Sequence, residues 1–127
     1  MAKNIPKGPS QRQLRVGEEI RHVLAQVLER EEFRDPGLQG VRLTVTEVRV
    51  SPDLINATAF VVPLGGGDMT PILEGLKRVN SFLRREVSHA VRLRAAPNLF
   101  FEADRTFDEA SHINELLHRP EVARDLK

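Results

Sequence analysis

The sequence has no cysteine, no tyrosine and no tryptophan, and phenylalanine is its only large aromatic residue. Without cysteine, disulfides and thiolate chemistry are excluded. Proteins that read single-stranded nucleic acid by stacking its bases need exposed rings, which are scarce here. The longest apolar run, AFVVPL, is far too short to cross a membrane. A chain of 127 residues with this composition predicts a single-domain, cytoplasmic protein without a membrane segment.

Charge is nearly balanced over the whole chain, at a formal +1, but it is unevenly distributed. Residues 77–94 contain the acid Glu86 against six cations, which are Lys77, Arg78, Arg84, Arg85, Arg92 and Arg94. Residues 101–115 contain the base Arg105 against five acids, which are Glu102, Asp104, Asp108, Glu109 and Glu115. We therefore expect opposite electrostatic potentials on these two segments.

The N-terminal half predicts a helix followed by a β-hairpin. Ser10 can cap a helix over residues 10–33, in which apolar residues recur at helical spacing. Alternation predicts strands over residues 41–50 and 54–62. The alternation changes phase near Thr46 and Glu47, which indicates a β-bulge. The second strand ends apolar on both faces, so we expect cover on both sides of the sheet.

The C-terminal half predicts a long helix from Pro71 to about residue 87, capped by Thr70. A break is predicted directly after it, at Ser88, His89 and Ala90, with a short helical segment continuing to about residue 95. Residues 98–103 predict a third strand, and residues 106–117 a last helix.

Three strands with two long helices predict a two-layer α+β domain. Its expected limits are residues 10–118, between a flexible basic arm (residues 1–9) and a C-terminal tail (residues 119–127).

The basic residues of the long helix lie opposite its apolar stripe when they are placed at about 100° per residue. They are Lys77, Arg78, Arg84 and Arg85, and Arg92 and Arg94 continue beyond the break. A solvated charged face is the common explanation of such a pattern. Here the face has a single sign, no glutamate lies four residues from its lysine, and a helix break frees backbone N–H groups. We interpret these six residues, with Arg12 and Arg15 of the first helix, as candidate phosphate-binding residues.

No motif predicts catalysis, a cofactor or a metal site. His112, Glu115 and His118 lack the i, i+4 spacing of a zinc-binding helix. The segment GGGDMT lacks the lysine and hydroxyl residue that end a phosphate-binding loop. We therefore predict a binding protein that is not an enzyme.

Two segments resemble a known family, VRVSPDL before the second strand and RLRAAPNLFFEAD through the third. Together, in this order, they are similar to bacterial ribosome-binding factor A over residues 12–117. The order of elements resembles the type-II KH fold. In ordinary KH domains a GXXG loop joins the two central helices, whereas this family has a kink there. The resemblance places the kink at Ser88, His89 and Ala90.

The resemblance implies an assembly factor that binds the immature small (30S) ribosomal subunit and its 16S rRNA. It implies assistance in maturing the 5′ end of that RNA without catalysis, a GTPase that triggers release, and a role in growth in the cold. A monomer is expected.

A second hypothesis stays open, which is a protein-interaction module. In that case the acidic C-terminal helix region, with Asp108 and Glu109, would dock a basic partner. Reversal of Arg84 and Arg85 discriminates the two, because it abolishes subunit binding only if the basic segment is the interface.

Overall fold

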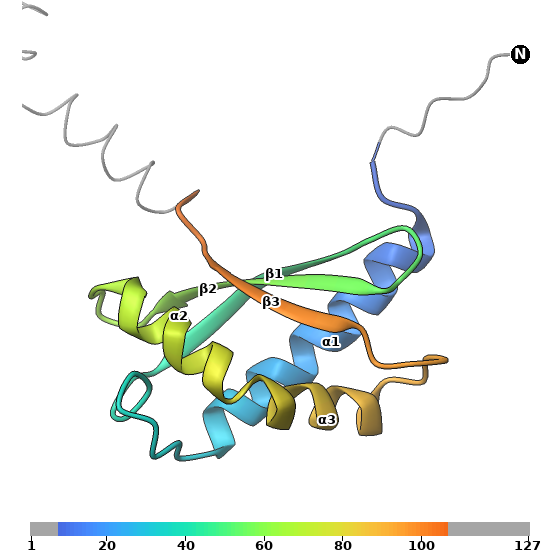
Figure 1. Cartoon of the computed structure of the whole chain (residues 1–127). Coiled ribbons are helices and arrows are strands. Elements are labelled where there is room, and N and C mark those ends of the chain that lie inside the picture. The colour runs from blue at the N-terminus through green and yellow to red at the C-terminus, as the bar shows by residue number, and fades with distance from the viewer. Residues whose placement is uncertain (1–7, 107–127) are drawn as a thin grey trace, which may run out of the picture.

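Three strands form one mixed sheet in the spatial order β1-β2-β3. The computed structural model describes residues 8–106, and Figure 1 shows the sheet with helices packed below it in that view. Along the chain the elements are α1 (Gln11–Arg30), β1 (Leu43–Val50), β2 (Asn56–Pro63), α2 (Met69–Arg78), α3 (Asn80–Ala90) and β3 (Asn98–Ala103). The predicted two-layer, type-II KH-like α+β fold is confirmed. The helix predicted over residues 106–117 lies outside the described residues, except for Thr106.

α1 begins at a capping box formed by Ser10 and Gln13. The Gln13 N–H donates to Ser10 Oγ at 3.1 Å, and the Ser10 N–H donates to Gln13 Oε1 at 2.8 Å. The Gln13 side chain also reaches the sheet, because its Nε2 donates to the Val50 carbonyl oxygen at 2.8 Å. These bonds fix the start of α1 beside the end of β1. The helix ends at Arg30 and is therefore shorter than the predicted 10–33.

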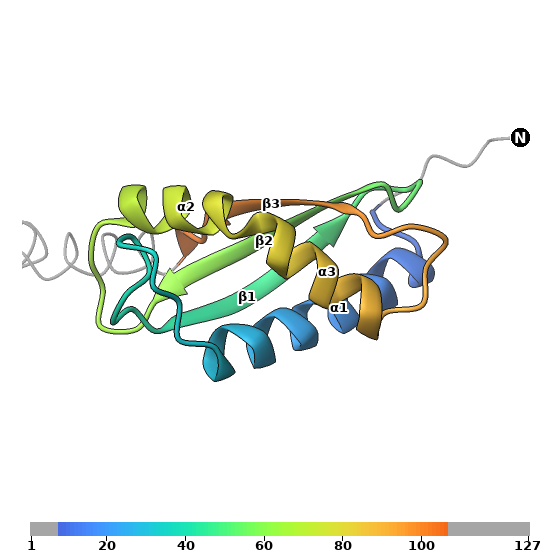
Figure 2. The same ribbon diagram turned by 60° about the horizontal axis from the view of Figure 1, so that its bottom comes forward.

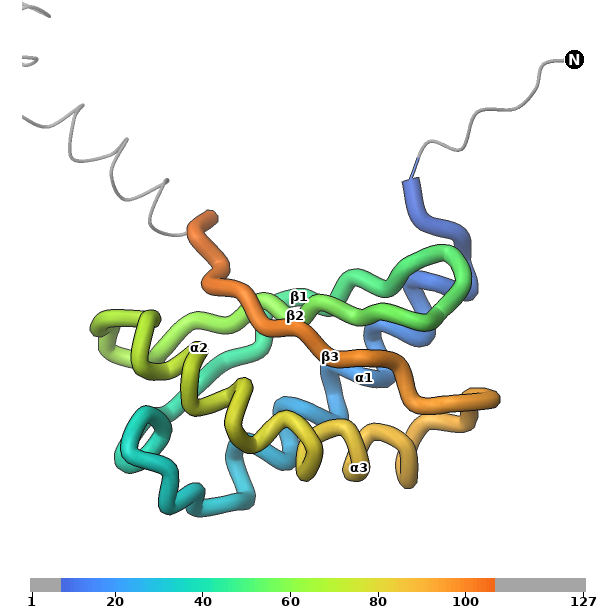
Figure 3. Tube along the Cα trace, in the orientation of Figure 1, coloured from blue at the N-terminus to red at the C-terminus, as the bar shows by residue number. Residues whose placement is uncertain are grey.

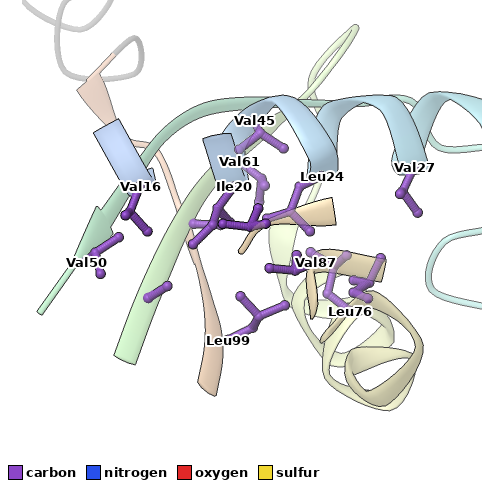
Figure 4. Close-up of a cluster of buried hydrophobic side chains, with 14 of the residues drawn as sticks. Val16, Ile20, Leu24, Val27, Val45, Val50, Val61, Leu76, Val87 and Leu99 are labelled. Carbon is purple, nitrogen blue, oxygen red and sulfur yellow. The ribbon is translucent and has the colours of Figure 1, made fainter. Parts of the chain in front are cut away.

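The core lies between one face of the sheet and the helices, all of which contribute to it. Figure 4 shows the α1 residues that point into this core, which are Val16, Ile20, Leu24 and Val27. Around them lie buried residues of the other elements, among them Val45, Val61, Leu76, Val87 and Leu99. The spacing of the α1 residues follows the helical repeat, which is why this stripe is visible in the sequence.

β1 and β2 form an antiparallel hairpin whose register shifts between Val45 and Glu47. This confirms the bulge that the change of phase predicts. The extra residue keeps Val45, Val48 and Val50 on the buried face of the sheet although their spacing along the strand changes.

β3 lies parallel to β2, from the Asn56–Asn98 pair to the Val61–Ala103 pair. Parallel neighbours need a crossover connection. Figure 3 traces this crossover through α2, α3 and residues 91–97. α1 and α3 pack against each other beneath the same face of the sheet (Figure 2). Within residues 8–106 no helix covers the opposite face, so cover on both sides is not observed in this part of the chain.

The cap of α2 is Asp68, whereas the sequence predicted Thr70. The Thr70 N–H donates to Asp68 Oδ1 at 3.0 Å, and the helix begins at Met69. Pro71 therefore occupies the third helical position instead of the first. The prediction was wrong because every position of a first helical turn tolerates proline, since the N–H groups there have no partner within the helix.

The long helix predicted as continuous to residue 87 is interrupted at Val79, which separates α2 from α3. Val79 has φ −96° and ψ 13°, outside the helical region. The Leu83 N–H still donates to the Val79 carbonyl oxygen at 3.1 Å, so the interruption is a kink rather than a loop. Asn80 Nδ2 donates to the Leu99 carbonyl oxygen at 3.0 Å and thereby ties the start of α3 to β3.

The kink predicted at Ser88, His89 and Ala90 is therefore misplaced. These residues form the last turn of α3, where Ser88 Oγ donates to the Arg85 carbonyl oxygen at 2.9 Å. The helical segment predicted to continue to residue 95 is absent, because residues 91–97 contain no helix. The helix–kink–helix expected in place of a GXXG loop is present, with its kink at Val79. None of the helices in residues 8–106 has the length and apolar character that crossing a membrane requires.

Candidate nucleic-acid interface

The eight cations predicted to bind RNA do not form one continuous strip, because α2 and α3 are separate helices. They fall into three groups according to their contacts. Arg78 and Arg84 bind other parts of the chain. Lys77, Arg85 and Arg94 are exposed around α2, α3 and the loop after them, whereas a groove beside α1 contains Arg12, Arg15 and Arg92.

Arg78 is paired with Asp35, which lies in the loop between α1 and β1. Its Nε lies 2.7 Å from Oδ2 and its Nη2 lies 2.9 Å from Oδ1. The hydrogen bonds from Arg78 lower the pKa of Asp35, and they raise the pKa of Arg78 itself. The Asp35 side chain is only 9% exposed. This bidentate geometry holds the loop on α2 and leaves the Arg78 guanidinium less available to a phosphate.

Two glycines allow the same loop to approach α2 closely. The Gly37 N–H donates to Asp35 Oδ1 at 2.8 Å, and a Cβ at Gly37 would collide with the Pro71 carbonyl oxygen. A Cβ at Gly75 would lie 2.7 Å from Asp35 Oδ1. Only residues without a side chain fit this approach. We refer to this contact as the loop–α2 lock, formed by Asp35, Gly37, Gly75 and Arg78.

Arg84 binds the backbone that precedes β3. Its Nε donates to the Pro97 carbonyl oxygen at 3.2 Å, and its Nη2 donates to the Ala96 carbonyl oxygen at 3.0 Å. These bonds hold the end of loop 91–97 against α3. Because β3 starts at Asn98, Arg84 helps to position the strand that pairs with β2.

Lys77, Arg85 and Arg94 are exposed, and within residues 8–106 none of them forms an ion pair. The Arg85 Cζ lies 6.0 Å from the centroid of the Phe82 ring. Phe82 in turn packs edge-on against Phe33, at 6.0 Å between centroids. Phe82 is therefore half-buried and engaged on two sides, which makes it a poor platform for stacking a base.

Arg12, Arg15 and Arg92 line one groove between α1 and the C-terminal end of α3, with a volume of about 770 Å³. We name it the α1–α3 groove, and its other lining residues are Val16, Glu19, His22, Val23, Ala90, Val91 and Leu93. Figure 2 shows that α3 crosses close to α1. Arg92 follows α3 in the chain and lines the groove together with residues of α1. Of the residues predicted to form the kink, Ala90 lines this groove.

The α1–α3 groove is predominantly positive, since three arginines face a single glutamate, Glu19. The arginines are exposed, and they form no ion pair with any residue in the range 8–106. The first turn of α1 contains no acid to offset the positive end of the helix dipole. Arg12 adds a further positive charge to that end, so a bound anion would relieve the repulsion. This arrangement suits a ligand that carries phosphates.

Glu19 and His22 also line the groove, although neither was predicted as a site residue. Their spacing contained a signal, because positions 12, 15, 19 and 22 recur every three or four residues and so share one helical face. The contribution of Arg92 had no comparable signal, since only the packing of α3 on α1 brings it there.

A second cavity, of about 850 Å³, lies beside the C-terminal half of α1 and β1. None of the eight predicted cations lines it, and its charges are mixed, with Glu29, Glu31 and Glu32 beside Arg21, Arg34 and Arg42. In the part of the chain that the structure describes, no three His, Asp or Glu residues are grouped to hold a metal ion. His112, Glu115 and His118 lie outside that part.

The chain is similar to known proteins in both sequence and structure. Residues 12–117 match the sequence model of the family described as Ribosome-binding factor A. Ribosome-binding factor A of Paramagnetospirillum magneticum is 67% identical over 120 residues, which are 94% of this chain and 84% of that protein. The crystal structure of ribosome-binding factor A from Thermus thermophilus gives a TM-score of 0.62 at 24% identity, covering 74% of this chain and 98% of that one.

A homology model of the Thermus thermophilus protein, fitted into a cryo-EM map of its 30S complex, gives a TM-score of 0.56 at 25% identity. It covers 69% of this chain and 90% of that one. The family match spans the elements that form the core and the α1–α3 groove from Arg12 onward. The chain belongs to the ribosome-binding factor A family.

Proposed function

We propose that the protein is a ribosome assembly factor that binds the immature 30S subunit through contacts with 16S rRNA. The 30S complex of the Thermus thermophilus relative supports the subunit as the target. The observation that carries the proposal in this chain is the α1–α3 groove. There Arg12, Arg15 and Arg92 converge, and none has a carboxylate partner within residues 8–106.

The proposed mechanism is binding without chemistry. Arginines in the groove contact backbone phosphates and release counterions, which supplies affinity with little dependence on base sequence. Lys77, Arg85 and Arg94 extend the contact along the outside of α2, α3 and loop 91–97. A protein that binds one conformation of an RNA more tightly than another shifts the RNA toward that conformation. In this way the protein would hold the rRNA in a state that favours maturation of its 5′ end.

Binding of the pure protein to isolated small subunits over a range of salt tests the proposal. The groove variant combines Arg15→Glu with Arg92→Glu. The control variant combines Arg34→Glu with Arg42→Glu, which makes the same change in charge at exposed arginines outside the groove.

We expect the groove variant to bind about 100-fold more weakly than wild type, with a salt dependence shallower by about 2 in log–log slope. The control variant should stay within about threefold of wild type, because it removes no phosphate contact. Equal weakening by both variants would show that only net charge matters and would refute the groove as the interface. Circular dichroism of each variant checks that the fold is intact.

The maturation step needs a cellular readout. In a strain whose only copy is the groove variant, 16S rRNA with an unprocessed 5′ end should accumulate on small subunits, measured by primer extension. Normal 5′ ends in a strain whose variant no longer binds subunits would separate binding from maturation and overturn this part of the proposal. A releasing GTPase, a role in the cold and a monomeric state stay predictions.

A further inference from the structure

The face of the sheet turned away from α1 and α3 carries its own arrangement of side chains. Strand register places Glu47, Phe60 and Glu102 in one row across the three strands. The neighbouring row contains Arg49 and Phe100, on either side of a β2 threonine. The Arg49 Cζ lies 5.1 Å from the Phe60 ring centroid, so the two rows share a face. We call this the open sheet face, formed by Glu47, Arg49, Phe60, Phe100, Glu102 and Asp104.

Apolar surface is exposed on this face, at the edge strand β3. Phe100 is 52% exposed, which is unusual for a phenylalanine within a strand. Phe60 is half-buried and lies under the Arg49 guanidinium. On the other side of the same strand, Ala59 is fully buried, so the strand does separate a core face from this one. An exposed ring beside a second ring offers an anchor for an apolar side chain of a partner.

The charge of the open sheet face is negative. Arg49 Nε lies 2.9 Å from Glu47 Oε2. This pairing is the main cause of the raised pKa of Arg49, and the negative charges of Glu102 and Asp104 raise it further. Three carboxylates thus share this face with one guanidinium, which is already paired with Glu47. Asp104 accepts hydrogen bonds from the Thr46 hydroxyl and, at 2.9 Å, from the Thr106 N–H. These bonds keep the Asp104 carboxylate fixed at the edge of the face.

The negative charge of the open sheet face decides which kind of partner can bind there. An RNA phosphate would be repelled by the carboxylates, which sets this face apart from the α1–α3 groove. Residues 107–127 of the chain contain more acids than bases, so they do not complement the face either. A cationic protein segment complements it, with an apolar side chain against the rings and basic side chains against the carboxylates.

We propose that the open sheet face docks a lysine- or arginine-rich protein segment of the small ribosomal subunit, anchored by an apolar residue on Phe100. This inference rests on the proposed function, because it takes the small subunit as the source of the partner. It gives the protein two contacts of opposite charge, one for rRNA and one for ribosomal protein. Together they would discriminate a subunit from free RNA, since free RNA satisfies only the groove.

Photo-crosslinking on the full-length protein tests the proposal. Phe100 is replaced by p-benzoylphenylalanine, an aromatic residue that its exposed position accommodates. The variant is mixed with purified small subunits, sedimented with them, irradiated, and the crosslinked products are identified by mass spectrometry. We expect crosslinks to a basic segment of one or two ribosomal proteins.

Crosslinks to rRNA, to residues 107–127 or to a second copy of the chain would overturn the proposal. Sedimentation with the subunit without any crosslink would also overturn it, while leaving the proposed function intact. The wild-type protein is sedimented in parallel, and its failure to sediment with the subunit would refute the proposed function and this inference with it.

A charge change sharpens the test. Adding Glu102→Lys to the crosslinking variant should lower the crosslink yield by at least about fivefold, because the cationic segment is then repelled. Glu32→Lys makes the same change at an exposed glutamate outside the face and should leave the yield unchanged. Equal yields in both variants would refute charge as the basis of recognition.

Discussion

The arginines of α2 and α3 and those of the α1–α3 groove look alike in sequence but differ in what the fold leaves them to bind. Arg78 and Arg84 donate to Asp35 and to backbone carbonyls before β3. Arg15 and Arg92 have no such partner within residues 8–106 and line a shared groove. The first pair contacts other parts of the chain, whereas the second pair is exposed and, in our proposal, binds the ligand. In a basic segment, the arginines that contact other parts of the chain therefore have to be identified first. Only the remaining arginines are candidates for binding a ligand.

Neutralising each pair of arginines in turn tests this difference most directly. Arg15→Gln with Arg92→Gln should weaken binding to small subunits by about 10- to 100-fold without changing the melting temperature. Arg78→Gln with Arg84→Gln makes the same change in charge but should lower the melting temperature, with affinity per folded molecule within about threefold. Subunit sedimentation and thermal denaturation measure the two effects. Equal losses of affinity would assign phosphate contacts to both pairs.

The glycines of the loop–α2 lock give the next largest effect. Gly37→Ala places a methyl group against the Pro71 carbonyl oxygen, which forces the loop away from α2. We expect the free energy of unfolding to fall by about 1–3 kcal/mol, as for other overpacked sites. Urea denaturation followed by circular dichroism measures it. Unchanged stability would show that the loop can move aside at little cost, and the lock would then contribute little.

Neighbouring arginines on α3 test whether the backbone contacts of Arg84 matter. Arg84→Gln removes the bonds to Pro97 and Ala96 and should cost about 1 kcal/mol of stability. Arg85→Gln is the matched control, because Arg85 lies over the Phe82 ring and forms no ion pair within residues 8–106, and it should stay within about 0.5 kcal/mol of wild type. If the two variants unfold at the same urea concentration, Arg84 does not position β3.

The smallest expected effect is a change in the stability of the fold at low pH. Arg78 lowers the pKa of Asp35 below its ordinary value of 3.8, so the pair stabilises the fold above that pH. The contribution is lost as the pH falls through the lowered folded-state pKa, because both folded and unfolded carboxyls are then protonated. The difference in stability between wild type and Asp35→Asn should therefore shrink as the pH is lowered from neutrality to below 3.8. A difference that is constant with pH would mean that the ion pair adds nothing.

Much of the fold could be predicted because it depends on local pattern. The stripe Val16, Ile20 and Leu24 follows the helical repeat, and the change of phase near Glu47 marks the bulge. The position of the kink could not be found in the same way. Apolar residues continue through Val79 at helical spacing, so the break is invisible to periodicity. Its one local signal is Asn80, a residue whose amide competes with helical hydrogen bonds and which here binds the Leu99 carbonyl oxygen.

The residues of the candidate site could be predicted from the sequence, but their convergence in one groove could not. Arg12, Arg15 and Arg92 were all recognised as cations of interest, yet only the packing of α3 on α1 shows that they meet. The role of Arg78 was hidden for the same reason, because its partner Asp35 is 43 residues away in the sequence. Their assignment to RNA stays a prediction, which the paired variants address.

The parallel pairing of β2 with β3 also constrains how the chain is made. Asn56 and Asn98, which begin this pairing, are 42 residues apart. At a synthesis rate of about 5–20 residues per second, β3 is completed roughly 2–8 s after β2. During that interval one edge of the central strand has no neighbour, and its apolar residues are open to other chains. The nascent protein is therefore most prone to aggregation just before its last described strand emerges, and truncation ahead of Asn98 would make that state permanent.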